Sequence, residues 1–163
     1  MSPAEQLLMI NISKFYKALN YAEHKIDLWY TKKENQKQER TVQLHNNLSL
    51  NHILKEEIPY IINWDKSKRG IPIFDFLIFY KKEYMDLEMN SLFNLYQNKY
   101  SFYPEEKLLF ESLISIPEKI ILNKTNYINT VNTKKIITYI DKTSQFLSEY
   151  NEKNENTNQE EFK

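Results

Sequence analysis

The beginning of the chain carries a stripe of apolar positions spaced three or four apart, as on one face of an α-helix. Its members are Leu8, Ile12, Phe15, Leu19, Ala22, Ile26 and Trp29. Ser2 and Pro3 precede the stripe and suit a helix start, because a serine hydroxyl caps N–H groups and proline fits the first turn. The pattern predicts a long helix over residues 3–30, followed by a charged loop over residues 31–40 (TKKENQKQER).

Three short segments with the composition of β-strands follow this loop. They are Thr41–Leu44, Ile53–Leu54 and Ile58–Trp64. Glu56 and Glu57 lie between the last two segments and are predicted to form the turn of a hairpin. We therefore expect a small β region within residues 41–64.

After Gly70 the apolar spacing becomes helical again. The predicted helices span residues 73–86, 88–99, 104–115, 117–122 and 130–150, with Pro104 and Pro117 in first turns. From residue 151 onward the chain (NEKNENTNQEEFK) has Phe162 as its single apolar residue, so residues 151–163 are predicted to be a disordered tail. The expected fold is mainly α-helical with a small β-hairpin element, in one domain over residues 1–150.

The composition limits which binding partners and which cellular compartment we expect for the protein. Hydrophobic residues make up 41% of the 163 positions, which is enough for a folded core. Lys plus Arg and Asp plus Glu both number 22, so no net charge favours nucleic acid or an anionic membrane. The absence of cysteine excludes disulfides and thiolate metal sites. Because no apolar run reaches the roughly 20 residues of a membrane span and no signal-peptide core opens the chain, we expect an intracellular protein that binds neither nucleic acid nor membrane.

Glycine is almost absent, and this excludes two nucleotide-binding motifs. Gly70 is the single glycine of the chain. Phosphate-binding loops need several glycines, since the backbone must approach the phosphate closely and adopt positive φ angles. Neither a P-loop nor a dinucleotide-binding fingerprint is therefore present.

One segment, LHNNLSLNHIL (44–54), has the frame of a phosphotransfer loop. Kinase-type phosphotransferases carry His-x-Asp and, five residues after the Asp, a metal-binding Asn; the Asp handles the attacking hydroxyl. Aligned on His45, the position of that Asp is Asn47 and the position of the metal-binding Asn is His52. Further along, Asn63 lies in the sequence Ile-Asn-Trp-Asp, and Asp75 lies in IPIFDFLIFY.

In order and spacing, these segments resemble the C-terminal lobe of aminoglycoside-phosphotransferase-like kinases, over residues 5–145. The closest resemblance is to spore coat proteins of the CotS and YsxE type, which often replace the catalytic consensus by a loop with two histidines and a serine. His45, Ser49, His52 and the segments 62–65 and 103–120 match that variant. The resemblance implies a kinase-like C-terminal lobe, located in the spore coat of a spore-forming bacterium, with other coat proteins or a second copy of the chain as partners.

The substituted residues argue against catalysis. Asn47 replaces the carboxylate that orients or accepts the substrate proton, and an amide is no base near neutral pH. Asn63 replaces the Asp that the resembled kinases use to bind Mg²⁺, and His52 replaces the second metal ligand by an imidazole. We therefore expect a pseudokinase without enzyme activity or cofactor. The resembled proteins also have an N-terminal lobe, whereas 44 residues precede His45, so we expect a truncated chain.

Two other functions stay open at this point. One is a small-molecule kinase of the aminoglycoside or choline type, whose N-terminal lobe is missing or belongs to another chain. The other is an unrelated helical adaptor, in which the kinase-like order of segments is accidental. His45 and His52 are interpreted as hydrogen-bonded scaffold residues of the loop, with a metal site as the alternative, for which His24 is the one further histidine.

Three further positions carry predictions. The resemblance gives Asp75 the role of a structural brace, whose carboxylate accepts hydrogen bonds from backbone N–H groups of the 45–50 loop. Asn46 takes the place of a glycine in the resembled loop, and asparagine is the side chain that best tolerates a positive φ there. The cations of residues 66–69 are interpreted as a solvated loop, with a phosphorylated or acidic partner as the alternative.

Overall fold

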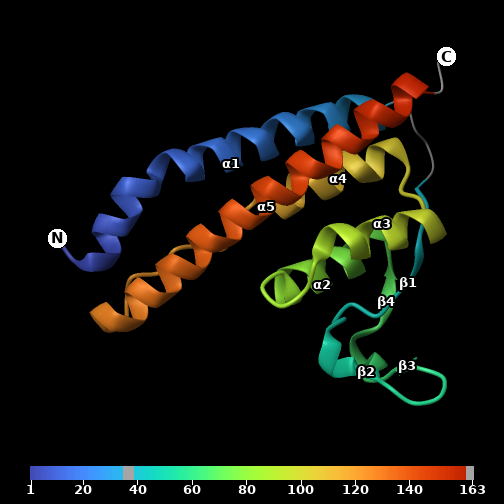
Figure 1. The fold of residues 1–163 in the computed structure, drawn as a ribbon, viewed down its shortest axis with the longest axis horizontal. Helices are drawn as coiled ribbons and strands as arrows, with labels where there is room; N and C mark the ends of the chain where they lie inside the picture. The colour runs from blue at the N-terminus through green and yellow to red at the C-terminus, as the bar shows by residue number, and fades with distance from the viewer. Residues whose placement is uncertain (35–38, 161–163) are drawn as a thin grey trace. The chain divides into compact units, whose positions relative to one another are not determined.

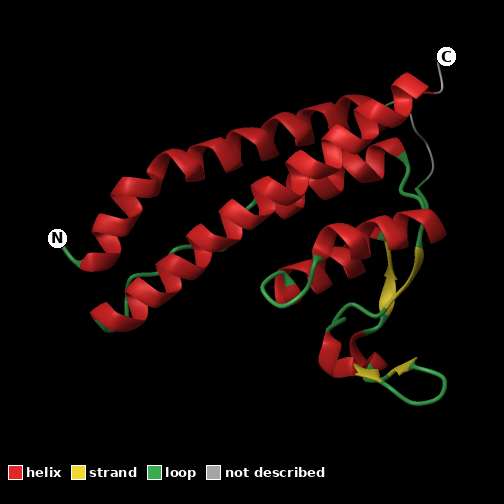
Figure 2. Cartoon of the chain, in the orientation of Figure 1, coloured by secondary structure: helices red, strands yellow, loops and turns green. Residues whose placement is uncertain are grey.

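The structure is a computed structural model that describes residues 1–34 and 39–160, with residues 152–160 described by their backbone alone. The described residues form five α-helices and two small two-stranded antiparallel sheets (Figures 1 and 2). This confirms the predicted fold class, mainly helical with a small β element. The chain divides into two compact units, one formed by residues 1–24 with the chain from Ile114 onward, the other by residues 25–113.

The first unit pairs the N-terminal part of α1 (Pro3–Lys33) with α5 (Asn126–Glu160). The two helices run side by side in the same direction (Figure 1), with Lys14 bonded to Asp141 and Tyr21 to Asn151. Their shared core consists of Phe15, Ile136, Ile137 and Ile140, with Leu7, Leu8, Ala18 and Ile120 packed against it. Burial of each large apolar side chain contributes about 1.5–3 kcal/mol, so this seam holds the unit together.

The apolar stripe predicted on α1 is only partly buried. Phe15 and Ala22 are buried, whereas Ile12 and Leu19 are 47% and 45% exposed. At about 100° per residue, Ile12 and Leu19 lie on the side of Phe15 that faces away from Ala18, which packs against the core. α1 ends at Lys33, and residues 35–38 of the predicted charged loop lie outside the described residues.

The prediction of a helix over residues 117–122 is wrong. Helix α4 (Pro104–Ser115) ends before Pro117, and residues 116–125 are not helical. A proline disfavours the helical conformation of the residue before it, here Ile116, so the chain leaves α4 at this point. Ile120 then packs against the core of the first unit from an extended segment.

Helix α5 is longer at both ends than the predicted helix over 130–150. It begins at Asn126, where the Thr125 hydroxyl accepts a hydrogen bond from the N–H of Ile128 at 3.4 Å. It ends at Glu160, so residues 151–160 are helical where a disordered tail was predicted. No glycine or proline interrupts this stretch, and extending an existing helix costs little compared with starting one. Residues 161–163 of the predicted tail lie outside the described residues.

The second unit contains both sheets. Strands β2 (Ile53–Leu54) and β3 (Tyr60–Ile61) pair antiparallel as the hairpin expected within residues 41–64. Strand β1 (Val42–Leu44) pairs with β4 (Lys68–Gly70), drawn in yellow in Figure 2, with Val42 opposite Gly70. Lys66, Lys68 and Arg69 are exposed, as the interpretation of a solvated loop requires. The loop assignment is wrong for Lys68 and Arg69, because they belong to β4, which pairs with β1.

Helices α2 (Ile73–Glu83), α3 (Met89–Lys99) and the first part of α4 enclose an aromatic core in the second unit. Phe93 and Phe110 stack with ring centroids 5.1 Å apart, and Phe76 contacts both rings at 4.9 and 5.9 Å. Phe102 lies against the same pair. This packing fixes α2, the helix that carries Asp75.

Candidate functional site

The loop after β1 is held by the carboxylates of α2. Asp75 Oδ2 accepts a hydrogen bond from the backbone N–H of His45 at 2.8 Å, and Oδ1 accepts one from Asn46 at 2.7 Å. The backbone N–H of Leu50 donates to Glu83 Oε1 at 2.9 Å, and Glu83 is buried. Two acidic residues of one helix thus bind the two ends of residues 45–50 by charge-assisted hydrogen bonds, which are stronger than neutral ones.

Asn46 adopts the backbone conformation considered for it from the sequence. Its φ is +58°, in the left-handed region that few residues other than glycine and asparagine enter at low cost. Asn63 also has a positive φ, of +62°. It precedes the short 3-10 helix Trp64–Lys66, and its exposed side chain makes no capping hydrogen bond there.

Lys82, also on α2, reaches the centre of the loop. Its amine donates to the side-chain oxygen of Asn47 at 2.8 Å and to the backbone oxygen of Asn47 at 2.9 Å. The side-chain oxygen of Asn47, a neutral amide, is thus already bound by an ammonium group.

Both loop histidines donate to backbone carbonyls. His45 Nε2 lies 2.7 Å from the carbonyl oxygen of Ile62, and His52 Nδ1 lies 2.9 Å from that of Asn47. Because a carbonyl oxygen can only accept, these two ring nitrogens carry the hydrogens. His45 is buried and packs edge-on against Trp64 at 4.9 Å, so its ring joins the loop to the hairpin.

The chemistry open to these residues is limited. The oxygens of Asp75 are occupied by backbone N–H groups, and Asn47 and Asn63 carry no charge. Within the described residues there is no group of three or more His, Asp or Glu side chains placed to hold a metal ion. The alternative of a metal site at His45 and His52 therefore finds no third ligand in that part of the chain.

Several large apolar side chains on and beside the β2–β3 hairpin are exposed. The exposed large apolar side chains here are Leu50, Leu54, Ile58, Tyr60, Ile61 and Trp64, and we call this set the hairpin surface. Ile58 at the hairpin turn is 80% exposed, and Trp64 is 47% exposed although its indole N–H donates to the carbonyl of Ile61. The set makes the segment 50–64 a candidate interaction element.

Sequence reasoning identified His45, Asn47, His52, Asn63 and Asp75 as site positions, and the structure places all five in or beside one loop. It missed Lys82 and Glu83, which hold the same loop. A signal for them was present, because residues seven and eight positions after Asp75 lie about two helical turns along a similar side of the helix.

In comparisons with known proteins, no family model, curated protein or solved structure matches the chain. None of the helices in the described residues is long and apolar enough to cross a membrane. The chain is thus a mainly helical protein in which two carboxylates of α2 brace the loop of residues 45–50.

Proposed function

We propose that this chain is a non-catalytic, spore-coat-type pseudokinase: a kinase-like C-terminal lobe that acts by docking to other proteins of the coat or to a second copy of itself. The observation that carries the proposal is the double hydrogen bond from His45 and Asn46 to Asp75. These hydrogen bonds are the brace that the resemblance implies. The braced loop has Asn47 at the position where the resembled kinases have the catalytic carboxylate.

The absence of catalysis follows from charge. Phosphoryl transfer needs a group that orients or accepts the hydroxyl proton and anionic oxygens that hold Mg²⁺. Asn47 offers an amide oxygen bound to Lys82, and Asn63 offers an exposed neutral amide. The loss of one such electrostatic contribution costs about 3–4 kcal/mol of transition-state stabilisation, and here two are lost.

The docking role is supported by the hairpin surface. The hairpin follows a loop that α2 binds at both ends, and Leu50, the first member of the set, is itself bound through its N–H by Glu83. Tyr60 and Trp64 belong to the residue types that are enriched among the few side chains supplying most of the binding energy of protein interfaces.

The first experiment tests nucleotide binding. Thermal unfolding is measured with and without ATP and Mg²⁺ at millimolar concentration, and we expect no shift in Tm. A stabilisation above about 1 kcal/mol, which mass action produces once the ligand exceeds its Kd several-fold, would favour the small-molecule kinase with its N-terminal lobe on another chain. The double variant Asn47→Asp/Asn63→Asp introduces carboxylates at both positions. Its Tm shift with ATP and Mg²⁺ is compared with that of the parent chain.

The second experiment tests docking. A fluorescent fusion of the chain is followed during sporulation in a spore-forming host, where we expect it to localise to the coat. Ile58→Asp places a charge on the hairpin surface and should abolish this localisation. Tyr127→Asp, at a position on α5 that is 78% exposed, matches the exposure of Ile58 and should leave localisation intact. Uniform cytoplasmic fluorescence of the parent chain would overturn the proposed coat function.

A further inference from the structure

The first unit contains a cleft between α1 and α5 that plays no part in the function proposed above. Its volume is about 280 Å³, near the lower end of the about 300–1,000 Å³ typical of ligand pockets. All of its lining residues belong to the first unit, and none of them belongs to the 45–52 loop or the hairpin surface. The cleft is therefore a separate feature that needs its own explanation.

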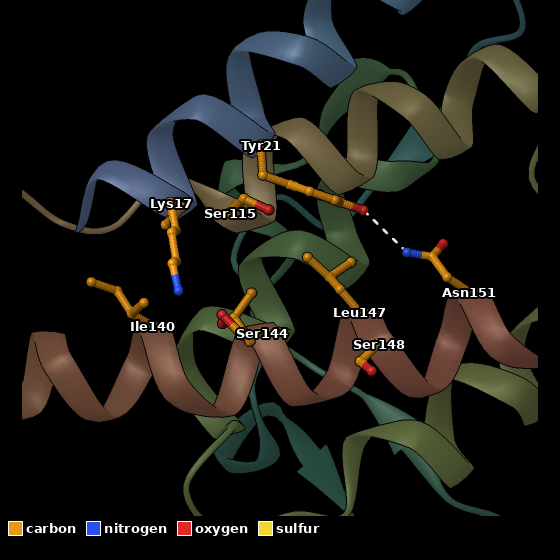
Figure 3. Close-up of a pocket in the computed structure, with 10 residues that line it drawn as sticks. Lys17, Tyr21, Ser115, Ile140, Ser144, Leu147, Ser148 and Asn151 are labelled. Atoms are coloured by element: carbon orange, nitrogen blue, oxygen red, sulfur yellow. Dashed lines mark hydrogen bonds between the residues drawn. The ribbon is translucent and has the colours of Figure 1, made fainter. Parts of the chain in front are cut away.

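The cleft has an apolar wall. Ala18 on α1 and the buried side chains of Ile140 and Leu147 on α5 line it. Figure 3 shows Leu147 projecting from α5 toward α1. Such a wall binds the hydrocarbon part of a ligand by excluding water from it.

The polar lining consists of hydroxyl groups, one amide and one amine. Ser115 and Thr143 are buried at the wall, and Ser144 is exposed beside them. Tyr21 and Asn151 join α1 to α5 at one end of the cleft, where the amide of Asn151 donates to the tyrosine oxygen at 3.2 Å (Figure 3).

The charge in the lining of the cleft is positive. Lys17 is the single charged residue of the lining, and its side chain extends from α1 toward α5 in Figure 3. The structure records no ion pair between the Lys17 amine and any described side chain. The neighbouring pair on the same two helices is already neutralised, since Lys14 binds Asp141 at 2.8 Å.

We infer that this cleft binds a small amphiphilic carboxylate, with its head group at the Lys17 amine and its hydrocarbon body against Ile140 and Leu147. A single ammonium group matches a single negative charge, and the lining contains no carboxylate that would favour a cationic ligand. No arginine lines the cleft, so the fork of donors that proteins commonly use for phosphate groups is absent from it. The small volume suits a medium-chain acid.

The test uses the full chain with octanoate as the probe and isothermal titration calorimetry as the readout. Octanoate should bind, and octylammonium, with the same body and the opposite charge, should not. Lys17→Gln should weaken octanoate binding at least ten-fold. Lys134→Gln makes the same change at an exposed position of α5 outside the cleft, and it should bind octanoate like the parent chain.

A second variant tests the place of binding without removing a buried group. Ser144→Trp introduces a large side chain at an exposed position of the lining and should abolish octanoate binding, while circular dichroism and the unfolding midpoint show that the chain still folds. The inference is overturned if the parent chain does not bind octanoate, if octylammonium binds equally well, or if either cleft variant binds octanoate like the parent. Each of these results leaves the proposed coat function untouched, because that function uses the second unit.

Discussion

Asp75 and Asn46 are joined by a hydrogen bond of 2.7 Å from the backbone N–H of Asn46 to Oδ1 of Asp75, and Asn46 has a φ of +58°. A left-handed backbone conformation is costly for most side chains, so it persists where surrounding contacts favour it. The carboxylate of Asp75 supplies such a contact and also binds the N–H of His45. At this end of the loop, the backbone conformation of Asn46 is therefore supported by one side chain of α2.

Replacement of Asp75 should destabilise the protein. Asp75→Ala leaves two backbone N–H groups without their charged acceptor, so we expect the free energy of unfolding to fall by about 1–3 kcal/mol. The measurement is a urea denaturation curve. Asp86→Ala removes an exposed carboxylate just beyond α2 and should change the free energy by less than about 0.5 kcal/mol. Equal effects of the two variants would contradict the bracing role of Asp75.

Two ion pairs of different burial should differ in their contribution to stability. Arg40 binds the buried carboxylate of Glu106 and lies over the rings of Tyr100 and Tyr103 at 4.3 and 4.1 Å. Arg40→Ala leaves Glu106 without its cation, and we expect a loss of about 3 kcal/mol in a denaturant melt.

The exposed pair between Lys14 and Asp141 is the control for that measurement. Both side chains are more than 40% exposed, so water and salt screen their attraction. Lys14→Ala should cost no more than about 1 kcal/mol, and less at high salt. A result in which Lys14→Ala costs as much as Arg40→Ala would show that burial does not set the difference.

Gly70 is constrained by packing. A Cβ atom at this position would lie 2.6 Å from Cδ1 of Leu44, a buried side chain in the opposite strand. We expect Gly70→Ala to destabilise the protein by about 1–3 kcal/mol, the usual range for overpacking. Lys68→Ala, an exposed change in the same strand, is the matched control in the same melt and should be near neutral. A neutral Gly70→Ala would mean that Leu44 moves aside freely.

Tyr96 should make stability depend on alkaline pH. Burial, followed by the proximity of Tyr100 and Asp75, raises the pKa of Tyr96 from 10.0 to about 12. Between these values the unfolded chain releases the phenol proton while the folded chain retains it, so stability is full below pH 10 and falls as pH rises toward 12. Tyr96→Phe should flatten this fall in denaturation curves measured across that range. The exposed Tyr127→Phe should leave the fall in place, and a fall that survives Tyr96→Phe would assign it to another group.

The helices were largely predictable because their signals are local. The first-turn prolines and the apolar spacing predicted the helix that begins at Pro104, and the stripe around Phe15 predicted most of α1. The errors arose where a local signal is ambiguous. Pro117 follows a helix instead of opening one. The polar residues 151–160 continue α5, because no glycine or proline interrupts the helix there.

The candidate site was predictable as a set of positions, together with the contact between Asp75 and the loop, but not in all of its contacts. His45, Asn47, His52 and Asn63 were found from the order of their segments, and Asp75 was expected to bind the 45–50 loop from the resemblance. That Lys82 binds Asn47, and that Glu83 binds Leu50, depends on how α2 is rotated against the loop. The spacing along α2 places Lys82 and Glu83 on a side similar to that of Asp75, but it does not fix how the helix is rotated against the loop.

The sequence by itself determined the helical spacing, the absence of a phosphate-binding loop and the neutral amides at positions 47 and 63. Tertiary structure alone decided that β4 pairs with β1, that Ile12 and Leu19 remain exposed, and that Lys17 faces a cleft. The physical reason is the distance along the sequence between the residues that interact. Helix propensity and charge belong to a few neighbouring residues, whereas pairing, burial and cavities arise when segments distant in the chain meet, and their register follows from packing as a whole.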